Sequence, residues 1–401
     1  MIDWEKKRLY RQRVEKELRE NILPFWIKYM KDEENGGFYG KIENDLTIHR
    51  DAPKGLVFCS RILWTYSAAY RLFQNPEHLD MAQRAYRYLL DYFEDKEYGG
   101  MYWLLDYKGK PLVDKKQIYG NAFAIYGLGE FYKATGNEES LQKAIELYHL
   151  IEKYSYDPGN RGYFEACTRE WRMTEDLRLS DKDMNEKKSM NTHLHILEAY
   201  TNLYRVWKDE SLKHKLKEII EVTVDHIIDP NTRHFILFFD EYWNPKSDLI
   251  SYGHDIEGSW LLWEAAEVLG DEGLLKKVRG ISEGMAYATY QEGLDQDGGL
   301  MNEGGPTGLV DTDKHWWPQA EAAVGFLNAY QLTGDGAFFE ASYRSWEFIE
   351  KYIIDREKGE WFWRVSKDGK PIQEEAKGDP WKGPYHNGRA CMEIMARLDN
   401  I

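Results

Sequence analysis

Three short motifs that contain histidine hold the residues of this sequence best suited to chemistry. Each opens a stretch with helical apolar periodicity, and the three are Asn191-Thr-His193-Leu-His195, Tyr252-Gly-His254-Asp255 and Tyr385-His386-Asn-Gly-Arg389. Imidazole changes charge near neutral pH, so histidines are the usual carriers of protons. The motifs stand at the same point of a repeating helical pattern, which lets distant side chains face one cavity. Together they predict proton-transfer chemistry.

Helical spacing separates the two histidines of the first motif. Asn191 and His195 are four residues apart and share a helix face, whereas His193 is two residues from His195 and points about 200° away. We therefore expect His195 to line the cavity. His193 is expected to be packed and hydrogen-bonded in the wall.

His254 and His386 each have a charged residue three positions later, Glu257 and Arg389 respectively. A carboxylate beside an imidazole orients it and raises its pKa, whereas an arginine lowers the pKa. The two pairs therefore predict one histidine acting as an acid and one acting as a base.

The motifs belong to a repeating unit made of a helix, a short turn, a second helix and a loop with glycine and aromatic residues. One copy begins at Arg61 and ends in the loop 98–103, and others begin at Asn121, Thr192, Asp255 and Ala320. The period is roughly 60 to 70 residues, which is typical of repeat architectures.

The two ends of the sequence supply the halves of a sixth copy. A lone outer-type helix is expected from Glu5 to Met30, and a lone inner-type helix from His386 to Leu398. This arrangement closes a ring, because an open solenoid needs polar capping repeats instead. We predict an all-α fold, an (α/α)6 barrel that forms one domain over residues 1–401. Short β-hairpins are expected in loops such as 36–52 and 234–249.

In such a barrel the N-terminal ends of the inner helices converge on one rim. Every copy has polar or aromatic residues at that point: Arg61, Tyr119, Asn191 with His195, His254 with Glu257, Trp317 with Glu321, and His386 with Arg389. The rim is therefore the predicted site.

Composition limits the possible partners. The chain has 401 residues, 15 Trp, 28 Tyr and a net charge of −16. The acid excess argues against nucleic acid or an anionic membrane as a partner, since either calls for a basic patch. Aromatic rings beyond the needs of a core favour a small carbohydrate ligand, although most of them fill the core.

The cysteines and the first residues bear on location. Cys59, Cys167 and Cys391 are odd in number, far apart and in no C-x-x-C arrangement, so neither a disulfide framework nor a zinc site is indicated. The sequence from Met1 has no apolar signal segment, and no run of about 18 apolar residues occurs. We expect a soluble cytoplasmic protein.

Other chemistries have weaker support. His193 and His195 splay apart on a helix and no acidic or cysteine cluster completes a metal site, while Gly127-Leu-Gly129 lacks the third glycine of a dinucleotide site. No metal or cofactor is predicted. Glycoside hydrolysis stays an alternative, because Asp255, Glu257 and Glu321 could supply two carboxylates about 5 to 10 Å apart. Asp255 is better explained as the N-cap of its helix.

Six segments together resemble the N-acylglucosamine 2-epimerase superfamily over essentially the whole chain. They are Gly36-Gly-Phe-Tyr-Gly40, Ala52-Pro-Lys-Gly55 with Ser60-Arg-Ile-Leu-Trp64, Met190-Asn-Thr-His-Leu-His195, Ser251-Tyr-Gly-His-Asp-Ile-Glu257, Trp316-Trp317 with Glu321, and Pro384-Tyr-His-Asn-Gly-Arg389. Each segment alone is weak, but six in order make a specific match.

The resemblance implies an (α/α)6 barrel that inverts C2 of the reducing-end glucose or mannose in a β-1,4-linked disaccharide, such as cellobiose or lactose, without metal or cofactor. It assigns His254 and His386 as the acid/base pair, with His195 assisting at the ring oxygen or O1. It also implies sugar-binding residues: Arg61, Tyr119, Asn191 and Glu257 as polar contacts, Trp317 and Trp381 as stacking rings, and Ser180 and Asp183 on the second sugar. Their position on the rim makes Glu321 and Arg389 further expected sugar contacts.

Two points stay open at the level of sequence. An aldose-ketose isomerase of the same superfamily uses the same histidines and passes through the same cis-enediolate, so an isomerase is the alternative within the family. We expect a monomer or weak homodimer.

Overall fold

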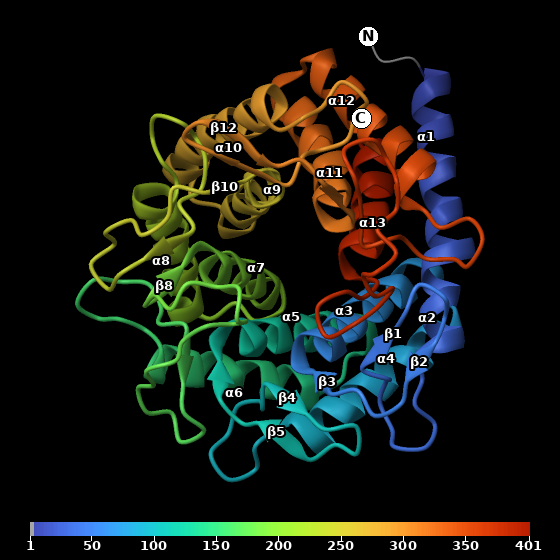
Figure 1. Cartoon of the computed structure of the whole chain (residues 1–401). Helices are drawn as coiled ribbons and strands as arrows, with labels where there is room; N and C mark the ends of the chain where they lie inside the picture. Colours follow the sequence, from blue (N-terminus) through green and yellow to red (C-terminus); the bar gives the residue numbers. More distant parts are fainter. Residues whose placement is uncertain (1–3) are drawn as a thin grey trace.

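Two concentric layers of helices form a closed ring, as Figure 1 shows for the computed structural model, which describes residues 4–401. Residues 1–3 lie outside the described part, and so does the start of the segment from Met1 that is predicted not to be a signal sequence. The inner helices are α3 (Leu56–Phe73), α5 (Ile118–Thr135), α7 (Met190–Val206), α9 (Tyr252–Leu269), α11 (Trp316–Thr333) and α13 (Tyr385–Asp399). This architecture confirms the predicted (α/α)6 barrel.

The outer helices follow the inner ones along the chain. They are α4 (Pro76–Tyr88), α6 (Glu138–Tyr154), α8 (Glu210–Val222), α10 (Glu272–Glu292), α12 (Gly336–Phe348) and the N-terminal pair α1 (Trp4–Glu17) and α2 (Leu23–Tyr29). Short π-helical turns join or extend them: η1 (Leu18–Ile22), η2 (Leu89–Phe93), η3 (Thr223–Ile227) and η4 (Ile349–Ile353). The inner helices are buried nearly all round, whereas the outer ones bury one face, as two layers around one core require.

Four of the five turns that lead from an inner to an outer helix share one local design, whereas Trp207 after α7 is extended. Helix α5 ends at Gly136, whose φ of 69° is left-handed, and the side chain of Asn137 then accepts a hydrogen bond from Ser140 N at 2.9 Å. Glycine adopts this conformation without strain, and Asn satisfies a free amide at the start of the next helix. Gly270 and Asp271 repeat the pair between α9 and α10.

The terminal helices close the ring as predicted. Helix α13 packs against α1, α3 and α11. The Arg11 guanidinium of α1 binds the Asp399 carboxylate of α13 at 2.6 Å, and the indole N–H of Trp361 donates to Glu17 at 2.9 Å. Residues from opposite ends of the described chain therefore form one unit of the barrel.

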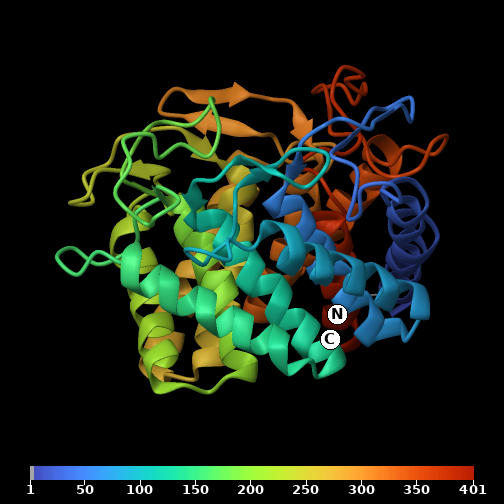
Figure 2. The ribbon, with the colours of Figure 1, turned by 90° about the horizontal axis from the view of Figure 1, so that it is seen from below.

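Short antiparallel strands gather with the long loops at one end of the barrel (Figure 2). The paired sets are β1 (Lys41–Ile42) with β2 (Ile48–His49); β3 (Lys54–Gly55), β4 (Leu104–Leu105) and β5 (Pro111–Val113); β6 (Lys116–Gln117) with β7 (Ala166–Cys167); β8 (Lys188–Ser189) with β9 (Phe238–Phe239); β10 (Ile250–Ser251), β11 (Glu303–Gly305) and β12 (Gly308–Asp311); and β13 (Lys314–His315) with β14 (Arg364–Val365).

The pairing confirms both predicted hairpins. Strands β1 and β2 form the hairpin expected within 36–52. Within 234–249, Phe239 forms an antiparallel bridge with Pro245, and Lys246 N donates to the Phe238 carbonyl at 2.8 Å. On its other side β9 pairs with β8, the strand that leads into α7. Strands β3, β6, β10 and β13 also lead directly into an inner helix, and each pairs with a strand of a later loop. The backbone groups of these entry strands need hydrogen-bond partners, and the later loop supplies them. These pairings fix where the inner helices begin.

A buried Asp–Lys pair recurs beneath these loops. The ammonium–carboxylate distances are 2.7 Å for Lys54–Asp32, 2.8 Å for Lys116–Asp95, 2.9 Å for Lys188–Asp157 and 2.9 Å for Lys314–Asp295, and Lys377 pairs with Asp355. The remaining repeat differs. Asp229 accepts hydrogen bonds from the backbone amides of the following turn, and β10 has Ile250 at the position where β3, β6, β8 and β13 have lysine. Each pair joins a loop to the segment that precedes the next inner helix. Breaking such a buried ion pair costs free energy of folding, so the pairs fix the loops in place.

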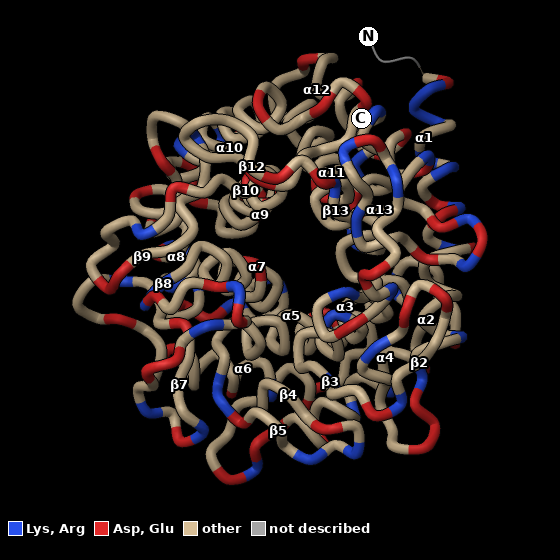
Figure 3. The backbone as a smooth tube through the Cα atoms, viewed as in Figure 1, with Lys and Arg blue, Asp and Glu red and all other residues tan. Residues whose placement is uncertain are grey.

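Several predictions about the surface and the thiols can be compared with the structure. Acidic and basic residues are interspersed around the ring (Figure 3). Cys59, Cys167 and Cys391 are buried free thiols. Within residues 4–401, no helix combines the length and apolarity that crossing a membrane requires.

Candidate active site

A cavity of about 260 Å³ lies at the rim where the inner helices begin. Nine of the residues predicted for the site line it: Arg61, Tyr119, Asn191, His195, His254, Glu257, Trp317, Trp381 and His386. Lys182, His315, Trp316 and Trp363 complete the lining. The structure therefore brings the three histidine motifs to one place.

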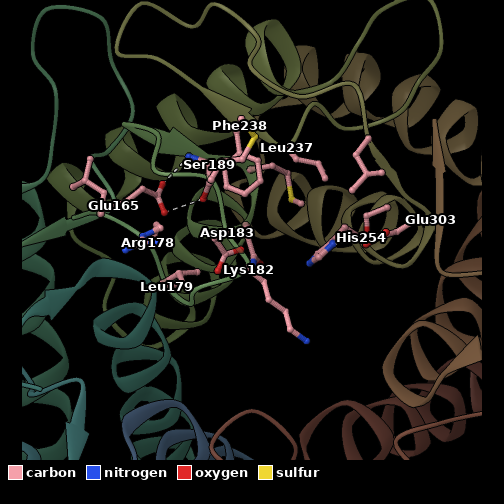
Figure 4. A pocket seen from close by; sticks show the side chains of 16 residues that line it. Glu165, Arg178, Leu179, Lys182, Asp183, Ser189, Leu237, Phe238, His254 and Glu303 are labelled. Atoms are coloured by element: carbon pink, nitrogen blue, oxygen red, sulfur yellow. Dashed lines mark hydrogen bonds between the residues drawn. The ribbon is translucent and has the colours of Figure 1, made fainter. Parts of the chain in front are cut away.

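A second cavity of about 240 Å³ adjoins the first and shares Lys182, Asn191 and His254 with it. Asp183 lines this second cavity, and its carboxylate accepts a hydrogen bond from Ser180 Oγ at 2.6 Å. Figure 4 shows Lys182 extending from the same loop toward the open centre, on the side away from Glu165.

His195 lies in the first turns of α7 with one ring nitrogen occupied. Its Nδ1 is 2.9 Å from Glu198 Oε2, and its ring packs against Phe123 at 4.6 Å and Tyr119 at 4.9 Å. Burial lowers the pKa of His195 by more than the Glu198 carboxylate restores. The imidazole is therefore neutral near pH 7, with Nε2 as its free nitrogen.

His254 and His386 lie against the same indole. The Trp317 ring centroid is 4.6 Å from the ring of His254 and 5.6 Å from that of His386. His254 Nδ1 is 2.7 Å from Ser251 Oγ, and His386 Nδ1 is 2.7 Å from Glu321 Oε1. Each ring is thus held through Nδ1, which leaves Nε2 for chemistry.

The predicted pairing of His254 with Glu257, and the pKa contrast between the two histidines that rests on it, are wrong. Glu257 bonds to Arg389 and not to His254, while His386 takes Glu321 as its partner. Burial is the largest cause for both histidines and lowers the pKa of each to about 3. The partners of Glu257 and His386 are not their neighbours on the same helix, because a buried carboxylate bonds to the strongest hydrogen-bond donor that faces it from another helix.

Arg389 stands at the centre of a buried cluster of charges. Its Nη2 lies 2.6 Å from Glu257 Oε1 and 2.7 Å from Glu321 Oε1, and its Nη1 binds Glu198. Tyr385 also donates to Glu198. Three carboxylates from α7, α9 and α11 therefore share one guanidinium from α13, which locks four inner helices together.

The three carboxyl groups of this cluster differ in acidity. Burial raises the pKa of Glu321, but the Arg389 guanidinium and the bond from His386 outweigh it and hold the value at about 2. The same balance lowers the pKa of Glu198. Burial and the Glu321 charge raise the pKa of Glu257 well above its usual value, and Arg389 offsets this only in part.

Three side chains of this cluster lie as close together as the ligands of a metal ion. Ligand atoms of Glu257, Glu321 and His386 lie within 4.8 Å of one another. The Arg389 guanidinium touches both carboxylates, so it supplies the cation that such a group of acids needs. Glu321 and Arg389 lie beneath the cavity and do not line it, contrary to their prediction as sugar contacts.

Arg61, Tyr119 and Trp381 form one side of the cavity. Arg61 donates from Nη1 to the Trp381 carbonyl at 2.6 Å and from Nη2 to the Tyr119 hydroxyl at 3.1 Å, and its guanidinium stacks on Phe123. Burial, which dominates over the nearby Arg61, raises the pKa of Tyr119 to about 12, so this hydroxyl keeps its proton. Flat rings beside fixed donors suit a sugar.

Two polar residues near the motifs are structural. His193 contacts the Ser189 carbonyl at 2.7 Å through Nδ1 and accepts from Tyr163 N at 2.9 Å through Nε2, as expected for a wall residue. Asp255 is not the N-cap of its helix, since α9 begins at Tyr252. Its carboxylate instead contacts His234 Nδ1 and Phe235 N, both at 2.7 Å, and anchors the loop before β9.

Sequence reasoning missed Glu198, Ser251 and Lys182. Glu198 follows His195 by three residues, so the spacing argument applied to the other two histidines would have found it. Ser251 is three residues before His254. Lys182 carries no such signal, because it enters the cavity from a loop rather than from a helix.

Comparisons with known proteins add to this geometry. The family model described as N-acylglucosamine 2-epimerase (GlcNAc 2-epimerase) matches residues 37–390. A cellobiose 2-epimerase of Bacteroides fragilis is 50% identical over 388 residues, 96% of this chain and 99% of that protein. The structure of a cellobiose 2-epimerase from Bacillus thermoamylovorans has a TM-score of 0.93 at 42% identity, covering 97% of this chain and 100% of that one. A D-mannose isomerase structure shares the fold, with a TM-score of 0.84 at 20% identity over 96% of this chain and 98% of that one.

Proposed function

Because the chain belongs to the N-acylglucosamine 2-epimerase family, we propose that it inverts C2 of the reducing-end sugar in a β-1,4-linked disaccharide, without metal or cofactor. Cellobiose would become 4-O-β-D-glucosyl-D-mannose, and lactose would react similarly. The observation that carries the proposal is a pair of histidines, His254 and His386, held through Nδ1 against one indole in a cavity. Residues 1–401 act together as one catalytic domain.

The chemistry follows from what inversion at C2 requires. The sugar ring opens so that the aldehyde acidifies the C2 proton, and a neutral imidazole removes that proton. The other imidazole, which receives through His195 the proton that O1 releases on ring opening, delivers it to the opposite face. His254 and His386 carry out these transfers through Nε2. Their lowered pKa values favour the neutral form that a base needs. The shared intermediate is a cis-enediolate.

The other cavity residues bind the sugar and stabilise charge. Arg61 and His195 donate to or exchange protons with O1, where negative charge develops in the enediolate. Tyr119 and Asn191 hold hydroxyl groups, and Trp317 and Trp381 stack on sugar faces. The second cavity receives the non-reducing sugar, with Asp183 on its wall and Ser180 holding the Asp183 carboxylate rather than lining the cavity. Glu321 and Arg389 position His386 and the other carboxylates from below.

Glycoside hydrolysis fits this geometry less well. Hydrolysis needs two carboxyl groups on opposite sides of the bond to be cleaved. Asp255 is fully buried away from the cavity, and Glu257 and Glu321 both bind the same nitrogen of Arg389. The two remaining carboxylates therefore lie on one side.

Reaction in deuterated water tests the proposed function directly. Incubating the protein with cellobiose should give an epimer of equal mass that carries deuterium at C2, because the proton returned comes from an imidazole that exchanges with solvent. Chromatography with mass spectrometry measures both. Free glucose would indicate a hydrolase, and a ketose as the main product an isomerase. Epimer without deuterium would contradict the two-histidine mechanism.

The acid side of the pH profile tests the state of the bases. A histidine of ordinary pKa would lose its neutral form roughly twentyfold between pH 7 and pH 5. Because burial lowers the pKa of His254 and His386 to about 3, kcat/KM should change by less than about threefold over that range. Circular dichroism at each pH checks that the protein stays folded. A midpoint near pH 6.5 would contradict the assignment.

A further inference from the structure

The buried groups of the site include more carboxyl groups than cations, because Lys182, which also lines the cavity, comes from an exposed loop position. Arg61 and Arg389 are the two guanidinium groups, and Glu198, Glu257 and Glu321 are the three carboxyl groups, each no more than 4% exposed. An unbalanced negative charge in a buried site is costly, and a carboxyl group avoids the cost by keeping its proton. One proton on the three groups makes the set neutral.

Hydrogen bonding shows which carboxyl group keeps the proton. Glu198 and Glu321 each accept from Arg389 and also contact a histidine ring nitrogen, so both are held as anions. Glu257 accepts from Arg389 through Oε1 alone, whereas its buried Oε2 has no partner. An anionic oxygen without a partner is unfavourable at a buried position, whereas a neutral hydroxyl there costs less. Glu257 itself lines the cavity.

Ring opening also lacks an acid in the resting enzyme unless Glu257 supplies it. Opening a hemiacetal ring needs a proton at the ring oxygen as the C1–O5 bond breaks. Burial keeps the imidazoles of His195, His254 and His386 neutral, and a neutral imidazole is a base. The pKa of Tyr119 is raised by burial to about 12, which makes its hydroxyl a weak acid.

We propose that Glu257 is a neutral carboxylic acid in the resting enzyme and that its Oε2–H is the acid that opens the sugar ring. The inference rests on the proposed function. In this step the Oε2 proton moves to O5, the C1–O5 bond breaks, the O1 proton passes to His195 Nε2, and C1 becomes the aldehyde carbon. The Glu257 anion formed is stabilised by Arg389. On ring closure after epimerisation, Glu257 recovers its proton from O5 and O1 takes back one proton from the histidines.

The groups that face Glu257 are consistent with this role. Arg389 and His386 come from α13, with His386 Nδ1 3.9 Å from Glu257 Oε1. Glu321 of α11 and Glu198 of α7 repel a charge on Glu257, while Arg61 of α3 and Tyr119 of α5 stand across the cavity. His254, one turn earlier on α9, lines the same cavity. Binding of a sugar oxygen would give Oε2 the partner it lacks.

Infrared difference spectroscopy tests the protonation state without any substrate. The spectrum of the wild type minus that of Glu257→Gln at pH 7 should contain a carboxylic acid carbonyl band, which lies at a higher frequency than carboxylate bands. Glu321→Gln is the matched control, because it changes a carboxyl on the same guanidinium nitrogen and should remove a carboxylate band instead. A carboxylate band lost from Glu257→Gln would overturn the proposal.

A substrate that cannot close its ring tests the role in catalysis. In 5-O-methyl cellobiose with a free reducing end, neither a five- nor a six-membered ring can form at that end, since O4 is glycosylated and O5 is methylated. Glu257→Gln should lower kcat on cellobiose by about 10²-fold or more. It should exchange the C2 proton of the open analogue within about threefold of the wild type. Glu321→Gln should lose exchange on both substrates, because His386 loses its partner.

The outcomes separate this inference from the proposed function. Equal impairment of Glu257→Gln on both substrates would show that Glu257 serves the C2 step and would overturn the ring-opening role. Retained activity of Glu257→Gln on cellobiose would overturn it as well. If the wild type fails to epimerise cellobiose but the carboxylic acid band is present, the proposed function fails while the protonated state of Glu257 stands.

Discussion

Replacing His386 or His254 by alanine is expected to lower kcat for cellobiose epimerisation by at least about 10³-fold, since each variant lacks one of the two groups that transfer a proton at C2. Both rings line the cavity, and each contacts the structure mainly through a single Nδ1 bond and the indole of Trp317. The fold should therefore survive. Chromatography of the epimers gives the rate, and circular dichroism verifies folding.

His214→Ala is the matched control, because the His214 side chain is 73% exposed on α8 and remote from the cavity. It should retain wild-type kcat. If either cavity variant kept more than about a tenth of the activity, the two-histidine assignment would be wrong, because loss of a general acid or base costs more than that. Failure of both variants to fold would be visible in the dichroism spectrum before any rate is measured.

Arg389→Met should reduce the free energy of unfolding by about 3 to 5 kcal/mol, because it leaves buried carboxylates without their cation. The guanidinium binds groups on α7, α9 and α11. Activity should also be lost, since Glu321 and Glu198 would no longer be fixed beside His386 and His195. Urea unfolding followed by fluorescence measures the change.

Two comparisons sharpen this result. Arg397→Met removes a guanidinium that also lies over Trp260, at 5.6 Å, but bonds to Asn328 and Gln331 and pairs with a single carboxylate, the partly exposed Glu393, at 3.3 Å. It should cost about 1 kcal/mol or less. Arg389→Lys should rescue little, because one ammonium cannot reproduce the planar set of donors. An Arg389→Met protein within 1 kcal/mol of the wild type would show that the cluster contributes little to stability.

The barrel and the position of its site could be predicted because both depend on periodicity. A helix pair every 60 to 70 residues indicates a ring once the terminal helices are counted as one unit, and the start of each inner helix then falls on one rim. His195 and His193 were separated correctly by helical phase alone. Local spacing therefore carried information about which side chains face the centre.

The partners of the site residues could not be predicted in the same way. Glu321 reaches His386, and Arg389 reaches Glu257, across the barrel between helices that are distant in sequence. Asp255 bonds to a loop residue rather than capping its own helix. Burial then sets the pKa values more strongly than any neighbour on the same helix. Such choices depend on the assembled ring, which local patterns do not describe.

The closure of the ring by α1 and α13 has a consequence for biosynthesis. Contacts such as that of Arg11 with Asp399 join residues 388 positions apart, so the sixth unit cannot form while the chain is still growing from its N-terminus. His386 and Arg389 both lie on α13. A nascent chain can thus hold helices, loops and most of the residues that line the cavity, but His386 and Arg389 reach their places only after α13 has left the ribosome and docked beside α1.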